Sequence, residues 1–212
     1  MISSLKIMPG ENSKPRSTRE KIIFAARRVF AEKGYSQTRI QDLLKAAGVS
    51  PGAFYNYFSN KEELFLEIVR ETGDQFRDSI KHIRRSRIRI GTQEELYAAL
   101  KESFRYFFEF VHRNRAGVRI LFREQQNANP RIRETLNEIV FEIQQDLKRD
   151  IQRGIDMGLI AISDPEIAAW GIISAVSGVG LNYLGHPKIE QDRLVKALSE
   201  LFLLGLFKRI PR

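Results

Sequence analysis

The sequence predicts an all-α protein: a three-helix head at the N-terminus, followed by a larger helical bundle, with about nine helices in all. Apolar residues recur at steps of three and four from Ile22 to the C-terminus, and no strand-like alternation of apolar and polar residues persists. The chain has 212 residues, of which 42% are hydrophobic, so it can bury a sizeable core. It contains no cysteine, which excludes disulfides and Cys-ligated zinc.

The head is predicted from paired helix-start and helix-stop signals. Three pairs fit the capping-box pattern Ser/Thr-x-x-Glu/Gln: Ser17 with Glu20, Thr38 with Gln41, and Ser59 with Glu62. Ser50 before Pro51 gives a further start, and Gly34 and Gly48 stand where helices should end through left-handed residues. The expected helices are Thr18–Lys33, Thr38–Ala47, Pro51–Tyr57 and a longer one at Asn60–Arg85.

Five more helices are expected beyond the head. They are Gln93–Arg113, Gly117–Gln126, Pro130–Met157, a helix that begins at Pro165 and ends before Pro187, and Ile189–Lys208. The helix from Pro165 contains the uncharged run Ile167–Gly185, which is about long enough to cross a membrane. Its glycines, serines and Asn182 dilute its hydrophobicity, so we expect a buried helix and no membrane partner.

The charge of the chain is concentrated near its start. The net charge is +9, and residues 1–90 carry +8 of it. This asymmetry is typical of an anion-binding head on a near-neutral body, although an ordinary basic surface would give the same count.

The segment Thr38–Phe58 has the form of a helix, a tight glycine turn and a second helix. Such a unit can place the N-terminal residues of its second helix in the major groove of DNA. A plain helical hairpin inside a bundle would show the same glycine turn. It has little reason, however, to place Tyr55, Asn56 and Tyr57 in succession, whereas hydroxyl and amide groups can bond phosphates and base edges.

Three stretches of the head resemble the N-terminal signature of the TetR/AcrR transcriptional regulators. They are FAEKGY at 30–35, AGVSPGAFYNYF at 47–58 and NKEEL at 60–64. The resemblance covers about Thr18–Val69 and implies a sequence-specific DNA-binding regulator. Repression is the usual mode of this family, with release from the operator when a ligand binds the C-terminal domain, and the sequence does not decide between a repressor and an activator. The expected division is a flexible tail at 1–16, a helix-turn-helix DNA-binding domain at 17–62, and a ligand-binding and dimerisation domain at 63–212.

The resemblance assigns contacts with an operator in double-stranded DNA to individual residues. Five approach bases: Pro51, Gly52, Ala53, Tyr55 and Asn56. Three hold phosphates: Thr38, Tyr57 and Lys61. Gln41 occupies a position that sometimes contacts a base, and Arg39 stands where many relatives have threonine. The basic tail could also reach the DNA, or it could be a solvated end with no role.

A homodimer is expected, because one short recognition helix makes few base contacts and two-fold symmetry doubles them. Small residues four apart in one late helix, and an apolar stripe in the last, could form the interface. These residues are Gly171, Ser174, Ala175, Gly178, Leu194, Leu198, Leu201 and Phe202. The alternative is that both helices lie inside the core.

A phenylalanine-rich helix suggests a cavity for a small, mostly apolar effector that the sequence does not identify. The candidate lining residues are Phe104, Phe107, Phe108, His112, Arg119 and Phe122. The alternative is that the phenylalanines form the core and the arginines lie on the surface.

Two other classes of protein fit the sequence less well than a regulator. An enzyme is disfavoured because the three histidines are far apart and no phosphate loop or nucleophile elbow occurs, so we expect no catalytic residues, metal or cofactor. A structural or interaction bundle would not need the basic head. The N-terminal residues do not fit a signal peptide, which favours a cytoplasmic protein.

Overall fold

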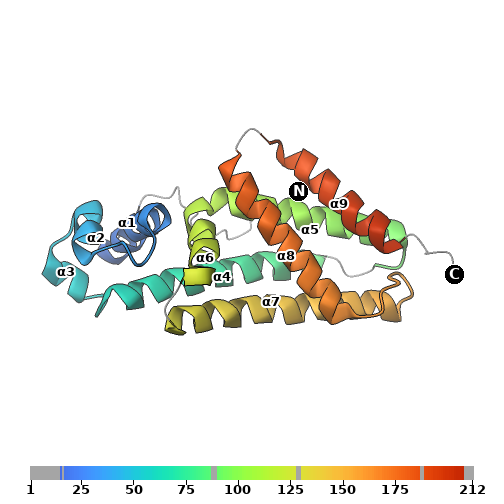
Figure 1. The fold of residues 1–212 in the computed structure, drawn as a ribbon, viewed down its shortest axis with the longest axis horizontal. Helices are drawn as coiled ribbons and strands as arrows, with labels where there is room; N and C mark the ends of the chain where they lie inside the picture. Colours follow the sequence, from blue (N-terminus) through green and yellow to red (C-terminus); the bar gives the residue numbers. More distant parts are fainter. Residues whose placement is uncertain (1–14, 16, 87–89, 128–129, 187–188, 208–212) are drawn as a thin grey trace. The chain divides into compact units, whose positions relative to one another are not determined.

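The computed structural model describes residues 15, 17–86, 90–127, 130–186 and 189–207, and the side chains of 79–86, 122–127 and 203–207 lie outside this description. Within these ranges the chain forms nine α-helices and no strand, which confirms the all-α prediction (Figure 1). The helices are α1 Thr18–Lys33, α2 Ile40–Ala47, α3 Pro51–Tyr55, α4 Lys61–Ser86, α5 Gln93–Arg113, α6 Arg115–Asn127, α7 Pro130–Asp156, α8 Pro165–Gly185 and α9 Gln191–Phe207.

The helices pack into two compact units. The first combines the described residues of Met1–Gln75 with those of Arg113–Asn137, and the second combines Phe76–His112 with Glu138–Arg212. The long helices α4 and α7 therefore contribute residues to both units. The predicted division after residue 62 concerns function rather than packing and stays a prediction.

Local sequence signals set several helix ends as predicted. The hydroxyls of Ser17 and Ser50 each accept a hydrogen bond from the backbone N–H three residues later, at 3.2 Å in both cases. The Asp164 carboxylate caps α8 by accepting from two backbone N–H groups, at 2.9 and 3.0 Å. Gly34 and Gly48 have φ values of 82° and 65°, a region that L side chains rarely adopt. Both glycine turns therefore lie where the sequence predicts them.

The predicted cap of α2 lies one residue too early, and its first helical residue is Ile40 rather than Thr38. Thr38 does not cap this helix, because its side chain is buried and its hydroxyl donates to the carbonyl of Gly34 at 2.7 Å. Arg39 is the N-cap residue instead, and its backbone N–H donates to the Asp42 carboxylate at 2.9 Å. The capping role predicted for Gln41 thus belongs to its neighbour.

The start of α4 is displaced in the same way. Asn60 rather than Ser59 accepts a hydrogen bond from the backbone N–H of Glu63, at 2.9 Å, and the Glu63 carboxylate accepts from the backbone N–H of Ser59, at 2.7 Å. Glu62, the residue expected in this role, pairs with Arg131 of α7 at 3.2 Å. Glu62, to which the sequence pattern assigned the capping role, therefore forms a tertiary ion pair instead.

Aromatic rings form the centre of the first unit. Phe30 of α1 meets Phe65 of α4 edge to face, with ring centroids 4.9 Å apart, and both rings are fully buried. The other described helices of this unit, and Phe58 between α3 and α4, add apolar side chains that are also buried: Leu43, Phe54, Val118, Ile120, Ile132 and Leu136. α6 and the start of α7 are thus part of the same core as α1 to α3.

α6 approaches α1 and α4 closely at Gly117. A Cβ at this position would lie 2.7 Å from the Thr72 hydroxyl and 3.2 Å from an Arg27 guanidinium nitrogen. Arg27 is itself buried, where it donates to Thr72 at 3.3 Å and to the Glu71 carboxylate at 2.7 Å. A buried guanidinium is stable only with such partners, so this cluster joins the three helices.

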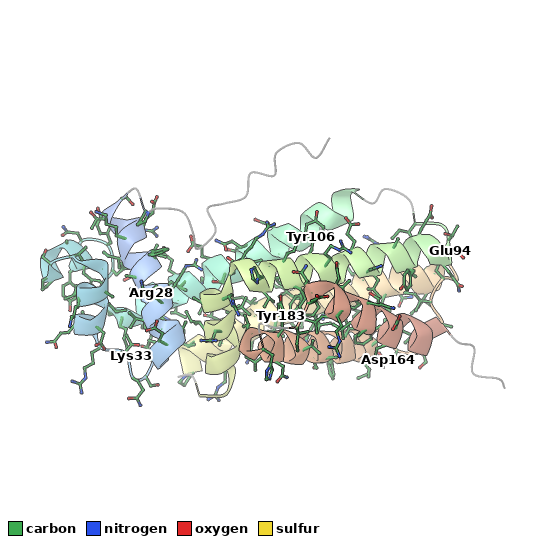
Figure 2. The ribbon with its side chains drawn as sticks, turned by 90° about the horizontal axis from the view of Figure 1, so that it is seen from above. Arg28, Lys33, Glu94, Tyr106, Asp164 and Tyr183 are labelled. Atoms are coloured by element: carbon green, nitrogen blue, oxygen red, sulfur yellow. The ribbon has the colours of Figure 1, made fainter. Side chains whose placement is uncertain are left out.

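The second unit is built around the phenylalanines of α5. Phe108 is fully buried and meets Tyr183 of α8 edge to face at 5.8 Å (Figure 2 labels Tyr183), and Phe104 meets Phe202 of α9, also at 5.8 Å. Gly180 lets α8 lie against the ring of Phe107, because a Cβ there would be only 3.0 Å from that ring.

α8 is buried along one side only, which corrects the expectation of a fully buried helix. Ala169, Ile172 and Val176 are buried, whereas Ile167, Trp170 and other residues on the opposite side are exposed. By length and composition this helix alone, among the described residues, could cross a membrane, with 28% of its most apolar window buried. Core helices of other proteins pass the same test, so the match is weak evidence for a span.

The close approach at Gly117 predicts a specific destabilisation. Gly117→Ala should lower the free energy of unfolding by about 1–3 kcal/mol, because the new methyl group overpacks the contact with Thr72 and Arg27. Gly185→Ala is the control, since its Cβ would meet nothing within 4 Å and alanine is the better helix former. Urea unfolding of both variants measures the difference, and equal stability would show that α6 does not approach so closely.

Candidate nucleic-acid interface

α2, the turn at Gly48 and α3 form a helix-turn-helix unit that is stabilised by buried side chains of both helices. Gly48 adopts the left-handed conformation, and its N–H donates to the carbonyl of Leu44 as α2 ends. Leu43 and Phe54 are fully buried and anchor the two helices in the core. Because Ser50 caps α3 directly after the turn, both the angle and the start of the second helix are fixed.

The outward side of α3 carries the residues that the sequence predicted to face DNA. Pro51, Gly52 and Asn56 are exposed, and Tyr55 and Tyr57 expose 53% and 44% of their surface. Ala53 is half-buried. Hydroxyl and amide groups therefore lie at the surface of a rigid two-helix unit, where they can reach phosphates and base edges.

The first turn of α2 is tied to the end of α1. The Asp42 carboxylate accepts hydrogen bonds from the Lys33 ammonium at 2.8 Å and from the backbone N–H of Arg39 at 2.9 Å. These two donors hold the pKa of Asp42 below its usual range. The side chains of Arg39 and Gln41 are exposed beside this turn, as are those of Arg28 and Lys33 of α1, which Figure 2 labels.

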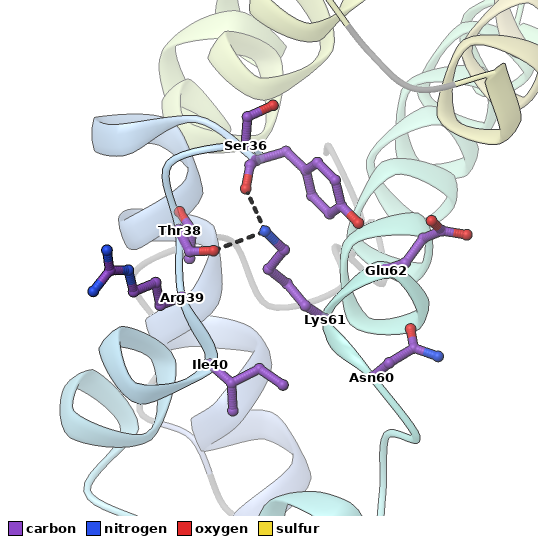
Figure 3. A pocket seen from close by; sticks show the side chains of 8 residues that line it. Ser36, Thr38, Arg39, Ile40, Asn60, Lys61 and Glu62 are labelled. Atoms are coloured by element: carbon purple, nitrogen blue, oxygen red, sulfur yellow. Dashed lines mark hydrogen bonds between the residues drawn. The ribbon is translucent and has the colours of Figure 1, made fainter.

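Thr38 and Lys61, both predicted to hold phosphates, are engaged within the protein. The Thr38 side chain is only 1% exposed. The Lys61 ammonium donates to the backbone carbonyls of Thr38 at 2.7 Å and Tyr35 at 2.8 Å, shown as dashed lines in Figure 3. Both residues line a shallow depression between the α1–α2 turn and the start of α4, with Ser36, Arg39, Ile40, Asn60 and Glu62.

The residues predicted to bind an effector are only partly brought together. Phe104, Phe107 and Phe108 belong to the aromatic core of the second unit, and His112 is exposed at the end of α5. Arg119 is exposed and belongs to the first unit. The side chain of Phe122 lies outside the described residues.

Three further residues of the aromatic core were not predicted from the sequence. They are Phe76, Gly180 and Tyr183, and Phe76 lies 5.8 Å from Phe107 between ring centroids. Phe76 follows Val69 and Thr72 at steps of three and four, so its apolar stripe was visible in the sequence. The contacts of α8 with α5 were not, because they join residues far apart in the chain.

The predicted dimer residues are mostly accessible in the single chain. Gly171, Ser174 and Gly178 of α8 and Leu201 of α9 are exposed. Ala175, Leu194 and Phe202 are half-buried, and Leu198 is buried.

An exposed polar helix on a helix-turn-helix unit is typical of DNA-binding proteins, and comparison with known proteins identifies the family. Residues 22–68 match the family described as "Bacterial regulatory proteins, tetR family", and residues 93–206 match "Tetracyclin repressor-like, C-terminal domain". The second match alone spans more than half of the chain. The protein therefore belongs to the TetR family of DNA-binding transcriptional regulators, a non-enzymatic family.

Individual relatives are similar to this chain over most of their length. An uncharacterised HTH-type transcriptional regulator of Haemophilus influenzae is 27% identical over 191 residues, which cover 89% of this chain and 88% of the relative. The HTH-type transcriptional activator FasR of Mycolicibacterium smegmatis is 26% identical over 75% of each chain. The crystal structure of the regulator FadR from Bacillus subtilis in complex with stearoyl-CoA shares the fold, with a TM-score of 0.72, 24% identity, and coverage of 88% and 98%.

Proposed function

We propose that this protein is a cytoplasmic repressor that binds operator DNA as a homodimer and is released when a long-chain fatty acyl-CoA binds its second unit. The DNA-binding role is supported mainly by α3, whose polar side is exposed while its Phe54 side chain is buried in the core of the first unit. The dimer, the effector and the repressing mode rest on the further arguments below.

The proposed DNA contacts come from α3 and the start of α2. Tyr55 and Asn56 are exposed at the end of α3, and Arg39 and Gln41 are exposed at the start of α2. An asparagine or glutamine side chain can bond adenine through two hydrogen bonds, and an arginine suits guanine or a phosphate. The remaining contacts are proposed at Pro51, Gly52, Ala53 and Tyr57.

A second copy of the chain is the proposed partner of the exposed side of α8 and α9. Trp170 and Leu181 on α8 and Leu201 on α9 are large apolar side chains that are exposed in the single chain. A Cβ at Gly171 or Gly178 would meet nothing within 4 Å, so a second helix could approach closely there. Covering this side in a dimer, rather than in a membrane, also satisfies the two-fold symmetry that operators usually require.

The aromatic core of the second unit is the proposed site for the acyl chain. Its rings come from α4, α5 and α8, and they include Phe76, Phe107, Phe108 and Tyr183. Such aromatic surroundings suit an apolar chain, and the FadR relative binds stearoyl-CoA. Because α4 runs through both units, a shift of α4 on binding would reach the head. Recognition helices must lie about 34–36 Å apart, or a multiple of this, so a modest displacement would weaken operator binding.

The DNA-binding proposal is tested with two exposed tyrosines. Tyr55→Ala should weaken binding to a selected operator about 5- to 150-fold, because removal of a base contact costs about 1–3 kcal/mol. Tyr97→Ala, which removes an exposed tyrosine of α5, should leave affinity unchanged. Titration of labelled operator, obtained by selection from random DNA, measures both. Equal affinities for the two variants would contradict the proposed interface, provided that circular dichroism shows both to be folded.

The dimer proposal is tested with two exposed apolar residues of the second unit. Leu201→Glu should weaken self-association at least about 100-fold, because a carboxylate would be buried without a partner. Phe141→Glu is the matched control, since Phe141 exposes 59% of its surface on α7, outside the proposed interface. Sedimentation equilibrium gives the dissociation constants. A Leu201→Glu protein as dimeric as the control would place the interface elsewhere.

The effector proposal is tested by release from DNA. Stearoyl-CoA, kept below its micelle concentration, should weaken operator affinity at least about 10-fold, a coupling of about 1.4 kcal/mol or more. Free CoA lacks the apolar chain and should not act, and a zwitterionic detergent of equal chain length controls for surfactant effects. Operator binding that is unaffected by stearoyl-CoA, or that falls equally with free CoA, would exclude this class of effector.

A further inference from the structure

The first residue of α4, Lys61, lies against the turn that joins α1 to α2. Its ammonium donates to the backbone carbonyl of Tyr35 at 2.8 Å and to that of Thr38 at 2.7 Å (Figure 3). These carbonyls lie 26 and 23 residues earlier in the chain. One side chain of α4 therefore holds two points of the turn that leads into α2.

The same ammonium lies over the ring of Tyr35, 4.2 Å from its centroid. The ring in turn packs against Phe65, at 4.8 Å between centroids, and Phe65 belongs to the buried core of the first unit. Cation–π attraction and two charge-assisted hydrogen bonds thus act on one group. The position of the turn is linked through this contact to the aromatic core.

The turn that Lys61 holds leads directly to proposed DNA contacts. The hydroxyl of Thr38 donates to the carbonyl of Gly34, so its side chain spans the same turn from the inside. The next residue, Arg39, is the N-cap of α2, and Gln41 follows in the first helical turn. Without the ammonium, the carbonyl of the buried Thr38 would lose its donor, and the start of α2 would be free to shift.

We infer that Lys61 is a positioning residue for DNA binding: it fixes the turn at residues 35–38, and with it Arg39 and Gln41, instead of neutralising a phosphate. This inference rests on the proposed DNA-binding role of α2 and α3. It differs from the phosphate contact that the family resemblance implies for this lysine. A phosphate contact and a positioning contact make different predictions, because a phosphate can be neutralised by lysine or arginine, whereas two fixed carbonyls require the geometry of one ammonium.

The first experiment measures operator affinity at several salt concentrations for Lys61→Met, Lys61→Arg and the control Arg39→Gln. Both Lys61 variants should bind at least about 10-fold more weakly than the parent, and Lys61→Arg, which keeps the charge, should not restore the affinity. Arginine keeps the charge but cannot reproduce the geometry of one ammonium between two carbonyls. Arg39→Gln removes an exposed cation and should reduce the slope by about 0.9 for each phosphate that the arginine neutralises.

The opposite pattern would overturn the inference. A reduced slope for Lys61→Met, together with parental affinity for Lys61→Arg, would assign Lys61 to a phosphate. Parental affinity for both variants would show that the lysine has no role in DNA binding.

A second measurement uses the unaltered protein without DNA. Brief acetylation followed by mass spectrometry should modify Lys61 at least about 10-fold more slowly than the exposed Lys45, because an ammonium stabilised by hydrogen bonds is a poor nucleophile. Equal rates would overturn the contact itself, even if a variant proved too unstable to study. If Lys61 is protected while Tyr55→Ala and Arg39→Gln both bind operator normally, the DNA interface fails and the contact within the protein stands.

Discussion

The proposed DNA-binding surface depends on the burial of one side chain, Phe54. α3 has five residues, whereas isolated helices shorter than about 12–15 residues are marginal in water. The proposed recognition helix is therefore held by tertiary contacts: Phe54 is fully buried and packs against Phe58, which precedes α4, with ring centroids 5.8 Å apart. The cap at Ser50 and the left-handed Gly48 then set where the helix begins. With these contacts in place, Tyr55 and Asn56 can be exposed on a helix that has no stability of its own.

The unit that carries this surface includes more of the chain than a helix-turn-helix head. α6 and the start of α7 share its core, and the buried Arg27 joins α1, α4 and the close approach at Gly117. Such a cluster has few alternative arrangements, because a shift of α6 would disturb the hydrogen bonds of the buried Arg27 guanidinium. A change that reaches α4 or α6 should therefore move the DNA-binding helices as a body rather than loosen them one by one.

α8 illustrates how one composition can serve three roles. Its uncharged sequence suits a core helix, a membrane span or a subunit interface, and neither length nor hydropathy distinguishes among them. In the structure one side packs on the second unit while the other carries small residues and exposed Trp170 and Leu181. Exposed apolar area beside glycines that leave room for another helix favours an interface, which is the basis of the dimer proposal.

The sequence by itself determined the helical class, the order of the elements and the outward residues of α3. These follow from contacts within a few residues: a hydroxyl and the N–H three positions later, a glycine with positive φ, or an apolar repeat. The predictions at Ser17, Ser50 and Gly48 are confirmed, because these residues form the local hydrogen bonds or turn that the pattern predicts.

Tertiary structure decided the cases in which two local patterns competed. Thr38 and Ser59 fitted the capping pattern, but Asp42 has a partner in Lys33, and Glu62 is held by Arg131, so the cap of each helix lies one residue later. The role of Lys61 was decided in the same way, since its two acceptors lie 23 and 26 residues away. A sequence pattern records which hydrogen bonds a residue can make with its neighbours. Which of them forms depends on the groups that folding brings beside it, because each donor and acceptor can serve only a few partners.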